Sequence, residues 1–292
     1  MGNCKNGSDD MKKNPLVSVI VNCFNSEKTI LRTINSILNQ TFTNFEIIVW
    51  DNDSFDSSRD LISSLDDNRI KLFKSNKTVS LGIARNFAIN EAKGKFIAFC
   101  DSDDWWELFK LKEQLGVLEG SQYSFVCSDF KIIDLISNTT SFKYQGRKSE
   151  IVSQCGLLKN YNVGLLTLLT YTKSIKKIVQ DETPEYMYMW DFDIILKISS
   201  IGDGYFVSSS TAFNTVASTS LSITGKLEAK KELGSWFIKH YDSITQSCPR
   251  VIKYINYKIV QCNGIFGSKI RFNYLSLIVV LIEKIYLKIK NK

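Results

Sequence analysis

The stretch Phe96-Ile-Ala-Phe-Cys-Asp101-Ser-Asp103-Asp-Trp-Trp106 decides the fold class of this chain. Its first five residues are apolar, as expected of a strand that is buried on both faces. Three carboxylates follow within four residues, so the buried run ends in an acidic loop. In α/β proteins, ligands bind beyond the carboxyl ends of such strands. The stretch therefore predicts an α/β protein with an acidic ligand site.

Strand and helix patterns alternate on the N-terminal side of this stretch. We expect strands at 17–23, 45–50, 70–74 and 96–100, and helices near 30–38, 57–65 and 81–92. This alternation predicts a mostly parallel, doubly wound sheet flanked by helices. The strand ends would bring 23–27, 51–56 and 101–104 to one edge. Farther along, we expect a helix at 109–118, strands at 124–135 and 141–144, a helix at 191–198 and helical structure after Leu227.

Charge divides the chain unevenly. From Pro249 onward there are nine Lys or Arg and one Glu, a net charge of +8, which leaves the remainder near −1. A nearly neutral body argues against nucleic-acid binding, whereas a basic end suits an anionic membrane surface. The apolar run Leu277–Ile282 is too short to span a bilayer, so it predicts an interfacial helix. The alternative is a terminal helix packed on the body.

The segment boundaries follow from these patterns. We expect a flexible N-terminal segment at 1–14, one domain at 15–225 and a basic helical extension at 226–292. The start of the chain lacks the apolar core of a signal peptide. Seven cysteines occur without a C-x-x-C spacing, which predicts free structural thiols in a reducing compartment. A cytoplasmic protein at the inner face of the cytoplasmic membrane is the expected location.

The acidic loop is the first candidate site. Crowded carboxylates repel one another unless cations pair with them. Oxygen ligands suit Mg²⁺ or Mn²⁺, which also bridge phosphate oxygens. A solvated loop or a helix cap is the alternative. Arg85, in the helix that precedes this strand, has two possible roles: it contacts phosphate, or it is a structural partner of Asp101 or Asp103.

Two residues at the other strand ends suit a nucleotide base. Asp51 offers a carboxylate that accepts a hydrogen bond from a base N–H. Phe24 offers a ring for stacking. The alternatives are a turn residue for Asp51, within Asp-Asn-Asp-Ser, and core packing for Phe24.

Four motifs in one order carry a resemblance to a known family. They are Val17-Ser-Val-Ile-Val-Asn-Cys-Phe-Asn25, Ile47-Ile-Val-Trp-Asp-Asn-Asp-Ser54, Leu81-Gly-Ile-Ala-Arg-Asn86 and the opening stretch. Together they resemble family 2 glycosyltransferases of the GT-A fold, particularly bacterial enzymes of lipopolysaccharide, O-antigen and capsule synthesis. The likeness covers roughly residues 15–225.

The resemblance implies a set of site residues. Phe24 and Asp51 would hold the uracil of a UDP-sugar, Asp101 the ribose or sugar, and Asp103 the metal ion, Mn²⁺ or Mg²⁺. The nucleotide-sugar site would also include Asn22, Asn25, Glu27, Arg85 and Ser102. The sequence departs from the family pattern with Asn22 and Cys23 in place of the frequent Pro and Thr, and with Asp53 in place of a turn glycine.

The resemblance also implies a catalytic base. Trp190-Asp-Phe-Asp-Ile-Ile-Leu-Lys-Ile198 matches the Glu-Asp-x-Asp segment of the family, with Trp190 in place of Glu. The base would be Asp191; Asp193 and, more distantly, Glu185 are the other candidates. On a helix, Asp191 and Asp193 point about 200° apart, so both cannot face one cleft.

The implied activity is inverting transfer of a hexose from a UDP-sugar to a hydroxyl of a lipid-linked glycan, in cell-surface polysaccharide synthesis. A catalytically silent sugar-nucleotide-binding module and a nucleotidylyltransferase are the alternatives. The nucleotidylyltransferase alternative lacks support because the chain has no Gly-rich N-terminal loop carrying basic residues.

Overall fold

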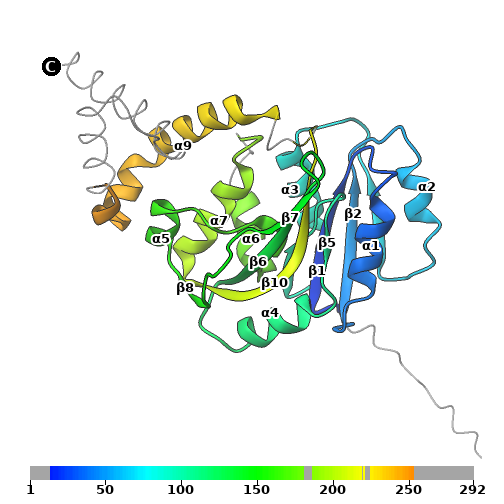
Figure 1. Ribbon diagram of the computed structural model, residues 1–292, viewed down its shortest axis with the longest axis horizontal. Helices are drawn as coiled ribbons and strands as arrows, with labels where there is room; N and C mark the ends of the chain where they lie inside the picture. The colour runs from blue at the N-terminus through cyan, green and yellow to red at the C-terminus, as the bar shows by residue number, and fades with distance from the viewer. Residues whose placement is uncertain (1–13, 181–185, 219, 221–223, 253–292) are drawn as a thin grey trace, which may run out of the picture.

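A mixed sheet forms the centre of the molecule. The computed structural model describes residues 14–180, 186–218, 220 and 224–252 (Figure 1). The first half of the sheet contains β1 (Val17–Cys23), β2 (Phe45–Asp51), β3 (Ile70–Lys74) and β4 (Phe96–Phe99), in the order β3-β2-β1-β4. Each neighbouring pair in this half is parallel, as the alternation of patterns predicts.

The second half of the sheet is mixed. It contains β9 (Leu169–Tyr171), β6 (Phe125–Asp134), β10 (Gly204–Val216) and β5 (Trp105–Trp106), which continue the order from β4. The short strand β9 runs antiparallel to both β4 and β6, whereas β10 is parallel to β6. The direction of β6 is thereby the same as that of β1, so their carboxyl ends lie at one edge. Antiparallel β5, β7 (Thr139–Phe142) and β8 (Glu150–Val152) complete the sheet.

Helices cover both faces of the sheet. On one face, apolar residues of α1 (Ile30–Leu38), α2 (Ser58–Ser63) and α4 (Lys110–Leu118) share a core with the strands. The opposite core receives residues from α3 (Leu81–Glu91), α5 (Gln154–Lys159), α6 (Thr172–Gln180), α7 (Trp190–Ile201) and α9 (Lys226–Ser247). A 3₁₀ turn, Leu165–Thr167, precedes β9. Figure 1 shows α9 beyond α7, at the end of the described chain.

The central strand explains the continuous apolar run in the sequence. Val19 and Val21 of β1 pack into the core beneath α1, whereas Ile20 packs into the core beneath α3. Every residue of β1 is buried. Burying one such side chain stabilises the fold by about 1.5–3 kcal/mol, so a strand with two covered faces has no polar alternation.

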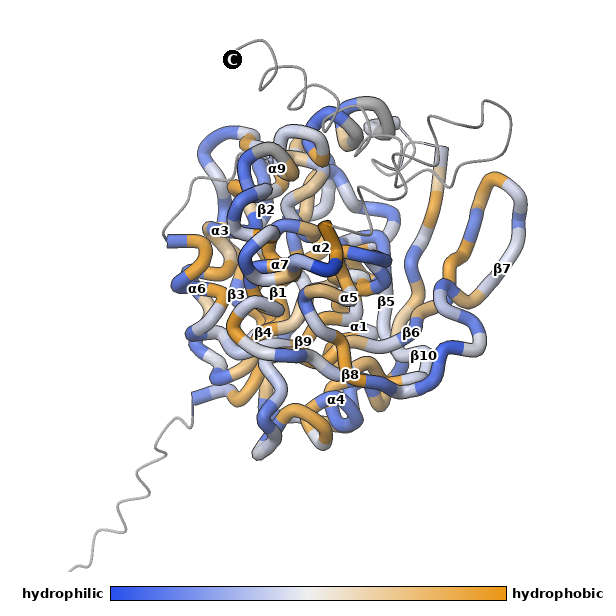
Figure 2. Tube along the Cα trace, turned by 90° about the vertical axis from the view of Figure 1, so that its left-hand side faces the viewer, coloured by the Kyte–Doolittle hydropathy of each residue, from blue (hydrophilic) through white to orange (hydrophobic). Residues whose placement is uncertain are grey.

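A hairpin projects from the body of the molecule (Figure 2). It joins the end of β6 to β7, and Asn138 takes a left-handed conformation in its turn, with φ of 52°. β7 begins two residues earlier than the strand expected at 141–144. Leu135 and Ile136 at the tip are each 60% exposed.

One prediction about cysteine is wrong. Cys155 of α5 and Cys248, directly after α9, form a disulfide, with their Cα atoms 5.6 Å apart. They lie 93 residues apart in sequence, so no local spacing indicates the pair. Cys23, Cys100 and Cys127 are buried free thiols, as expected.

Two expectations lie outside the described residues. They are the flexible N-terminal segment, apart from Asn14, and the interfacial helix at Leu277–Ile282. Among the described residues, no helix is both long and apolar enough to cross a bilayer.

Candidate active site

Three loops meet at the carboxyl ends of β1, β2 and β4. The amide of Asn25 donates to Ser54 Oγ at 3.0 Å, which joins the first loop to the second. The hydroxyls of Ser26 and Ser102 are 2.7 Å apart, which joins the first loop to the acidic loop. The three segments that sequence places at one edge are therefore in contact.

One of the three carboxylates in the acidic loop is structural. Asp104 is 1% exposed, and its carboxylate accepts the Thr215 amide at 2.8 Å and the Asn214 Nδ2 at 3.1 Å. Burial, together with the charges of Asp101 and Asp103, raises the pKa of Asp104. Asp104 thus ties the loop to β10, whereas Asp101 and Asp103 are accessible to solvent.

Arg85 pairs with Asp101. Its Nη2 lies 2.8 Å from Asp101 Oδ1, and the guanidinium lies 5.1 Å from the centre of the Trp190 ring. Arg85 is 7% exposed, whereas the Asp101 side chain is 44% exposed. The structural role expected for Arg85 is thereby observed, and it orients the Asp101 carboxylate while leaving one side accessible.

Asp103 has the properties of a metal ligand. Its side chain is accessible to solvent, and within the described part of the chain no side chain donates a hydrogen bond to its carboxylate. Partial burial and the charge of Asp101 raise the pKa of Asp103 to about 6. Arg32 holds the loop from behind by donating to the Asp103 carbonyl at 2.6 Å.

The donor set fits a divalent ion that is shared with phosphate. Among the described residues, no group of three His, Cys, Asp or Glu side chains forms a ready cage. Mg²⁺ needs no such cage, because one or two carboxylates together with substrate phosphates and water complete its octahedron. Asp103, beside Asp101, supplies such carboxylates.

The second loop contains an ion pair that sequence analysis did not find. Asp51 is fully buried, and it accepts the Ser54 amide and Arg59 Nε, each at 3.3 Å. Arg59 lies on α2, eight residues from Asp51, and no motif marks it. Asp51 therefore shapes its turn and also carries a cationic neighbour.

Two aromatic rings stand at this edge. Phe24 is 45% exposed and Phe55 is 86% exposed, and the rings meet edge to face with centres 6.2 Å apart. The alternative expectation, that Phe24 packs in the core, is therefore wrong. An exposed ring at a strand end offers a face on which a planar base stacks.

Asn25 and Glu27 join the first loop to the second. Asn25 takes a φ of 50°, and its Oδ1 accepts the Phe55 amide at 3.0 Å. Glu27 Oε2 accepts the Ser57 amide at 3.1 Å, at the start of α2. Deeper in the strand, the Nδ2 of Asn22 is buried and has no hydrogen-bond partner among the described residues.

Helix α7 separates the two aspartates that it carries. Burial raises the pKa of Asp191, the positive charge of Arg85 lowers it, and the negative charge of Asp101 raises it. The charges of Arg85 and Asp101 therefore act on the Asp191 carboxylate. Asp193 is 8% exposed and accepts Trp236 Nε1 at 2.6 Å and Lys197 Nζ at 2.7 Å. The two aspartates therefore have different neighbours. Glu185 lies outside the described residues.

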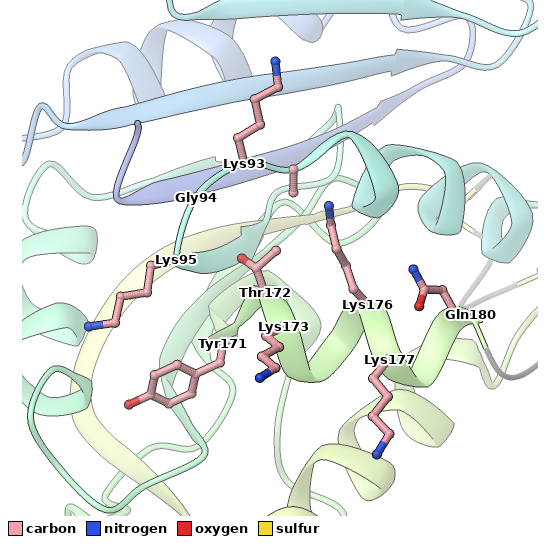
Figure 3. A pocket seen from close by; sticks show the side chains of 10 residues that line it. Lys93, Gly94, Lys95, Tyr171, Thr172, Lys173, Lys176, Lys177 and Gln180 are labelled. Carbon is pink, nitrogen blue, oxygen red and sulfur yellow. The ribbon is translucent and has the colours of Figure 1, made fainter. Parts of the chain in front are cut away.

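A surface cavity elsewhere does not form part of this site. It has a volume of about 710 Å³ and is lined by the connection between α3 and β4 and by α6, including Lys93, Lys95, Lys173, Lys176 and Lys177. Figure 3 shows the five amino groups pointing in different directions. Such an arrangement is that of a solvated basic face, not of a convergent anion site.

Comparison with known proteins defines the class. Residues 18–172 match the family model described as glycosyl transferase family 2. Two Escherichia coli relatives, WfgD and WfaP, are named UDP-Glc:alpha-D-GlcNAc-diphosphoundecaprenol beta-1,3-glucosyltransferases. WfgD is 37% identical over 53% of this chain and 59% of its own length. WfaP is 33% identical over 64% of this chain and 71% of its own length.

A solved structure shows the same fold. Staphylococcus aureus TarS, residues 1–349, in complex with UDP-GlcNAc aligns with a TM-score of 0.60, at 19% identity, over 75% of this chain and 64% of that one. The fold is accordingly GT-A. The chain belongs to glycosyl transferase family 2.

Proposed function

We propose that this protein transfers a hexose from a UDP-sugar to a hydroxyl of a lipid-linked glycan in cell-surface polysaccharide synthesis. Family membership and the names of WfgD and WfaP support the reaction class. One observation supports the proposal at the level of residues: Asp101 is accessible and paired with Arg85, and the charges of both residues act on Asp191.

The donor is bound by the first and second loops. Uracil stacks on Phe24 above the turn that Asp51 shapes; because the Asp51 carboxylate is fully buried, it would accept the base N–H only after that turn moves. The Nδ2 of Asn22, buried without a partner among the described residues, is one donor that a ligand oxygen would satisfy. Asp101, oriented by Arg85, accepts hydrogen bonds from ribose or sugar hydroxyls.

Asp103 would hold the divalent ion, Mn²⁺ or Mg²⁺. When bound, the ion supplies charge neutralisation for the leaving UDP. Asp191 accepts the proton of the acceptor hydroxyl as that oxygen attacks the anomeric carbon. Attack from the face opposite UDP inverts the configuration, so an α-linked donor yields a β-glycoside, which is the linkage in the names of WfgD and WfaP.

The basic C-terminal region brings the protein to an anionic membrane surface at the cytoplasmic face. Nine basic residues from Pro249 onward support this proposal. Each contributes about 1 kcal/mol near anionic lipid. A lipid-linked acceptor requires the active site to work near that surface.

A donor panel tests the proposal. Purified protein is incubated with individual UDP-sugars and a GlcNAc-diphospholipid acceptor, with Mn²⁺ or with EDTA, and released UDP is measured. We expect metal-dependent UDP release with one donor. UDP-sugar binding without release under every condition would indicate the silent module. Release of pyrophosphate when a nucleoside triphosphate is incubated with a sugar phosphate would indicate a nucleotidylyltransferase.

A further inference from the structure

Helix α9 binds the loop that leads into α7. Glu232 of α9 accepts three successive backbone amides: Met187 at 3.0 Å, Tyr188 at 2.8 Å and Met189 at 3.0 Å. These peptides directly precede Trp190, the first residue of α7, and the side chain of Met189 provides no helix cap. A carboxylate at this position satisfies exposed amides and favours the positive end of the helix. Glu232 therefore holds the three peptides that lead into α7, and it does not bond the N2 or N3 amide that a local N-cap side chain would accept.

A second contact lies one helical turn farther along α9. The indole Nε1 of Trp236 donates to Asp193 Oδ1 at 2.6 Å. Trp236 is 3% exposed, and its ring meets Phe192 edge to face at 4.9 Å. Because both partners of this bond are buried, the bond fixes the rotation of the first turn of α7 about its own axis.

Asp191 lies between these two attachments. The loop before it is held by Glu232 and the residue two positions after it is held by Trp236. Helix α9 thus contacts the chain on both sides of Asp191, in addition to the bond that Trp190 makes with Asn86 of α3. Neither Glu232 nor Trp236 belongs to the three loops that form the donor site.

We propose that Glu232 and Trp236 are positioning residues that aim Asp191 at the acceptor hydroxyl. This inference rests on the proposed function, in which Asp191 is the base. A general base works only within hydrogen-bond reach of its proton, and a shift of about 1 Å costs about 10²-fold in rate. Losing either contact leaves the donor site intact and misplaces the carboxylate.

The primary test is Glu232→Gln, compared with Glu228→Gln. The glutamine side chain retains one acceptor oxygen, so it cannot hold all three amides as the carboxylate does. We expect kcat, normalised to UDP-binding sites, to fall by about 10-fold to 10²-fold, with KM for the UDP-sugar changed by less than about twofold. Glu228, exposed one turn earlier on α9, makes the matched control and should keep full kcat. Trp236→Phe, which keeps an aromatic ring and loses the N–H, should lower kcat in the same way.

A double-mutant cycle separates positioning from a general loss of structure. If Glu232 acts through Asp191, adding Glu232→Gln to Asp191→Asn causes no further loss of kcat. Losses that multiply would overturn the proposal, as would full kcat in both Glu232→Gln and Trp236→Phe while Asp191→Asn is inactive. Full kcat in Asp191→Asn would overturn the base assignment and this inference with it. UDP affinity by calorimetry verifies that each variant retains a folded donor site.

Discussion

Substitutions at the two aspartates of α7 should have different effects, one on activity and the other on stability. Replacing Asp191 by Asn removes the proposed base and keeps the size of the side chain. Loss of a general base costs about 10²-fold to 10⁴-fold in rate. At about 1.36 kcal/mol per tenfold, this equals about 3–5 kcal/mol of lost transition-state stabilisation. We expect kcat of Asp191→Asn to fall by at least about 10²-fold, with UDP-sugar affinity nearly unchanged.

The stability of Asp191→Asn should not fall. Burial raises the pKa of Asp191 above 3.8, so its stabilising contribution is present below the unfolded pKa and is lost as pH rises through the folded pKa. At pH 7 the buried negative charge of Asp191 therefore lowers the stability of the fold, and Asn removes that penalty. The same raised pKa moves the acidic limb of the kcat profile of the wild type above pH 3.8, since only the ionised form accepts a proton.

Asp193→Asn should have the opposite effect. The new amide oxygen still accepts the Trp236 N–H, but the variant loses the ion pair with Lys197, which is 2.7 Å long and only partly exposed. A charge-assisted bond of this kind contributes about 2 kcal/mol, which lowers Tm by about 4–8 °C. We expect kcat within about threefold of wild type. Differential scanning calorimetry and UDP-release assays measure both quantities. An inactive Asp193→Asn with an active Asp191→Asn would refute the alignment of α7 with the family motif.

Three further predictions follow from other parts of the molecule. Asp103→Ala and EDTA should each abolish turnover. Mn²⁺ should raise Tm more at pH 7.5 than at pH 5, because protons compete with the ion for the Asp103 carboxylate below about pH 6. Equal shifts of Tm at the two pH values would contradict this. Gly204→Ala should lose about 1–3 kcal/mol in urea unfolding, because the new Cβ meets the Phe125 ring, whereas Gly116→Ala, with open space, should not. Deleting 249–292 should abolish flotation with anionic liposomes; unchanged flotation would exclude the tail.

The N-terminal half of the fold was predictable because β1 and β2 are seven-residue strands that are buried on both faces. The runs 17–23, 45–50 and 70–74 each exceed four residues and end at turn-forming side chains. By contrast, β9 and β8 have only three residues each, and no periodicity is visible over so short a length. The antiparallel position of β9 between β4 and β6 depends on tertiary pairing alone.

The candidate site was predictable as a set of residues, but only some of its bonds were. Strand ends place Asp51 and Asp101 near one edge. Arg85 of α3 was expected as a possible partner of Asp101 or Asp103, and it pairs with Asp101. Arg59 reaches Asp51 from α2, and no pattern in the sequence indicates that pair. The contact of Glu232 with the start of α7 is of the same kind.

Trp190 illustrates how a departure from the family motif is accommodated. In place of a carboxylate, the chain has an indole that is 3% exposed, donates to Asn86 Oδ1 at 3.1 Å and meets Phe99 edge to face. The guanidinium of Arg85 lies over the same ring. A Glu at this position would compete with Asp101 for Arg85, whereas the neutral ring leaves that ion pair intact. Near the start of α7, the negative charge that favours a helix N-terminus comes from Glu232 of α9.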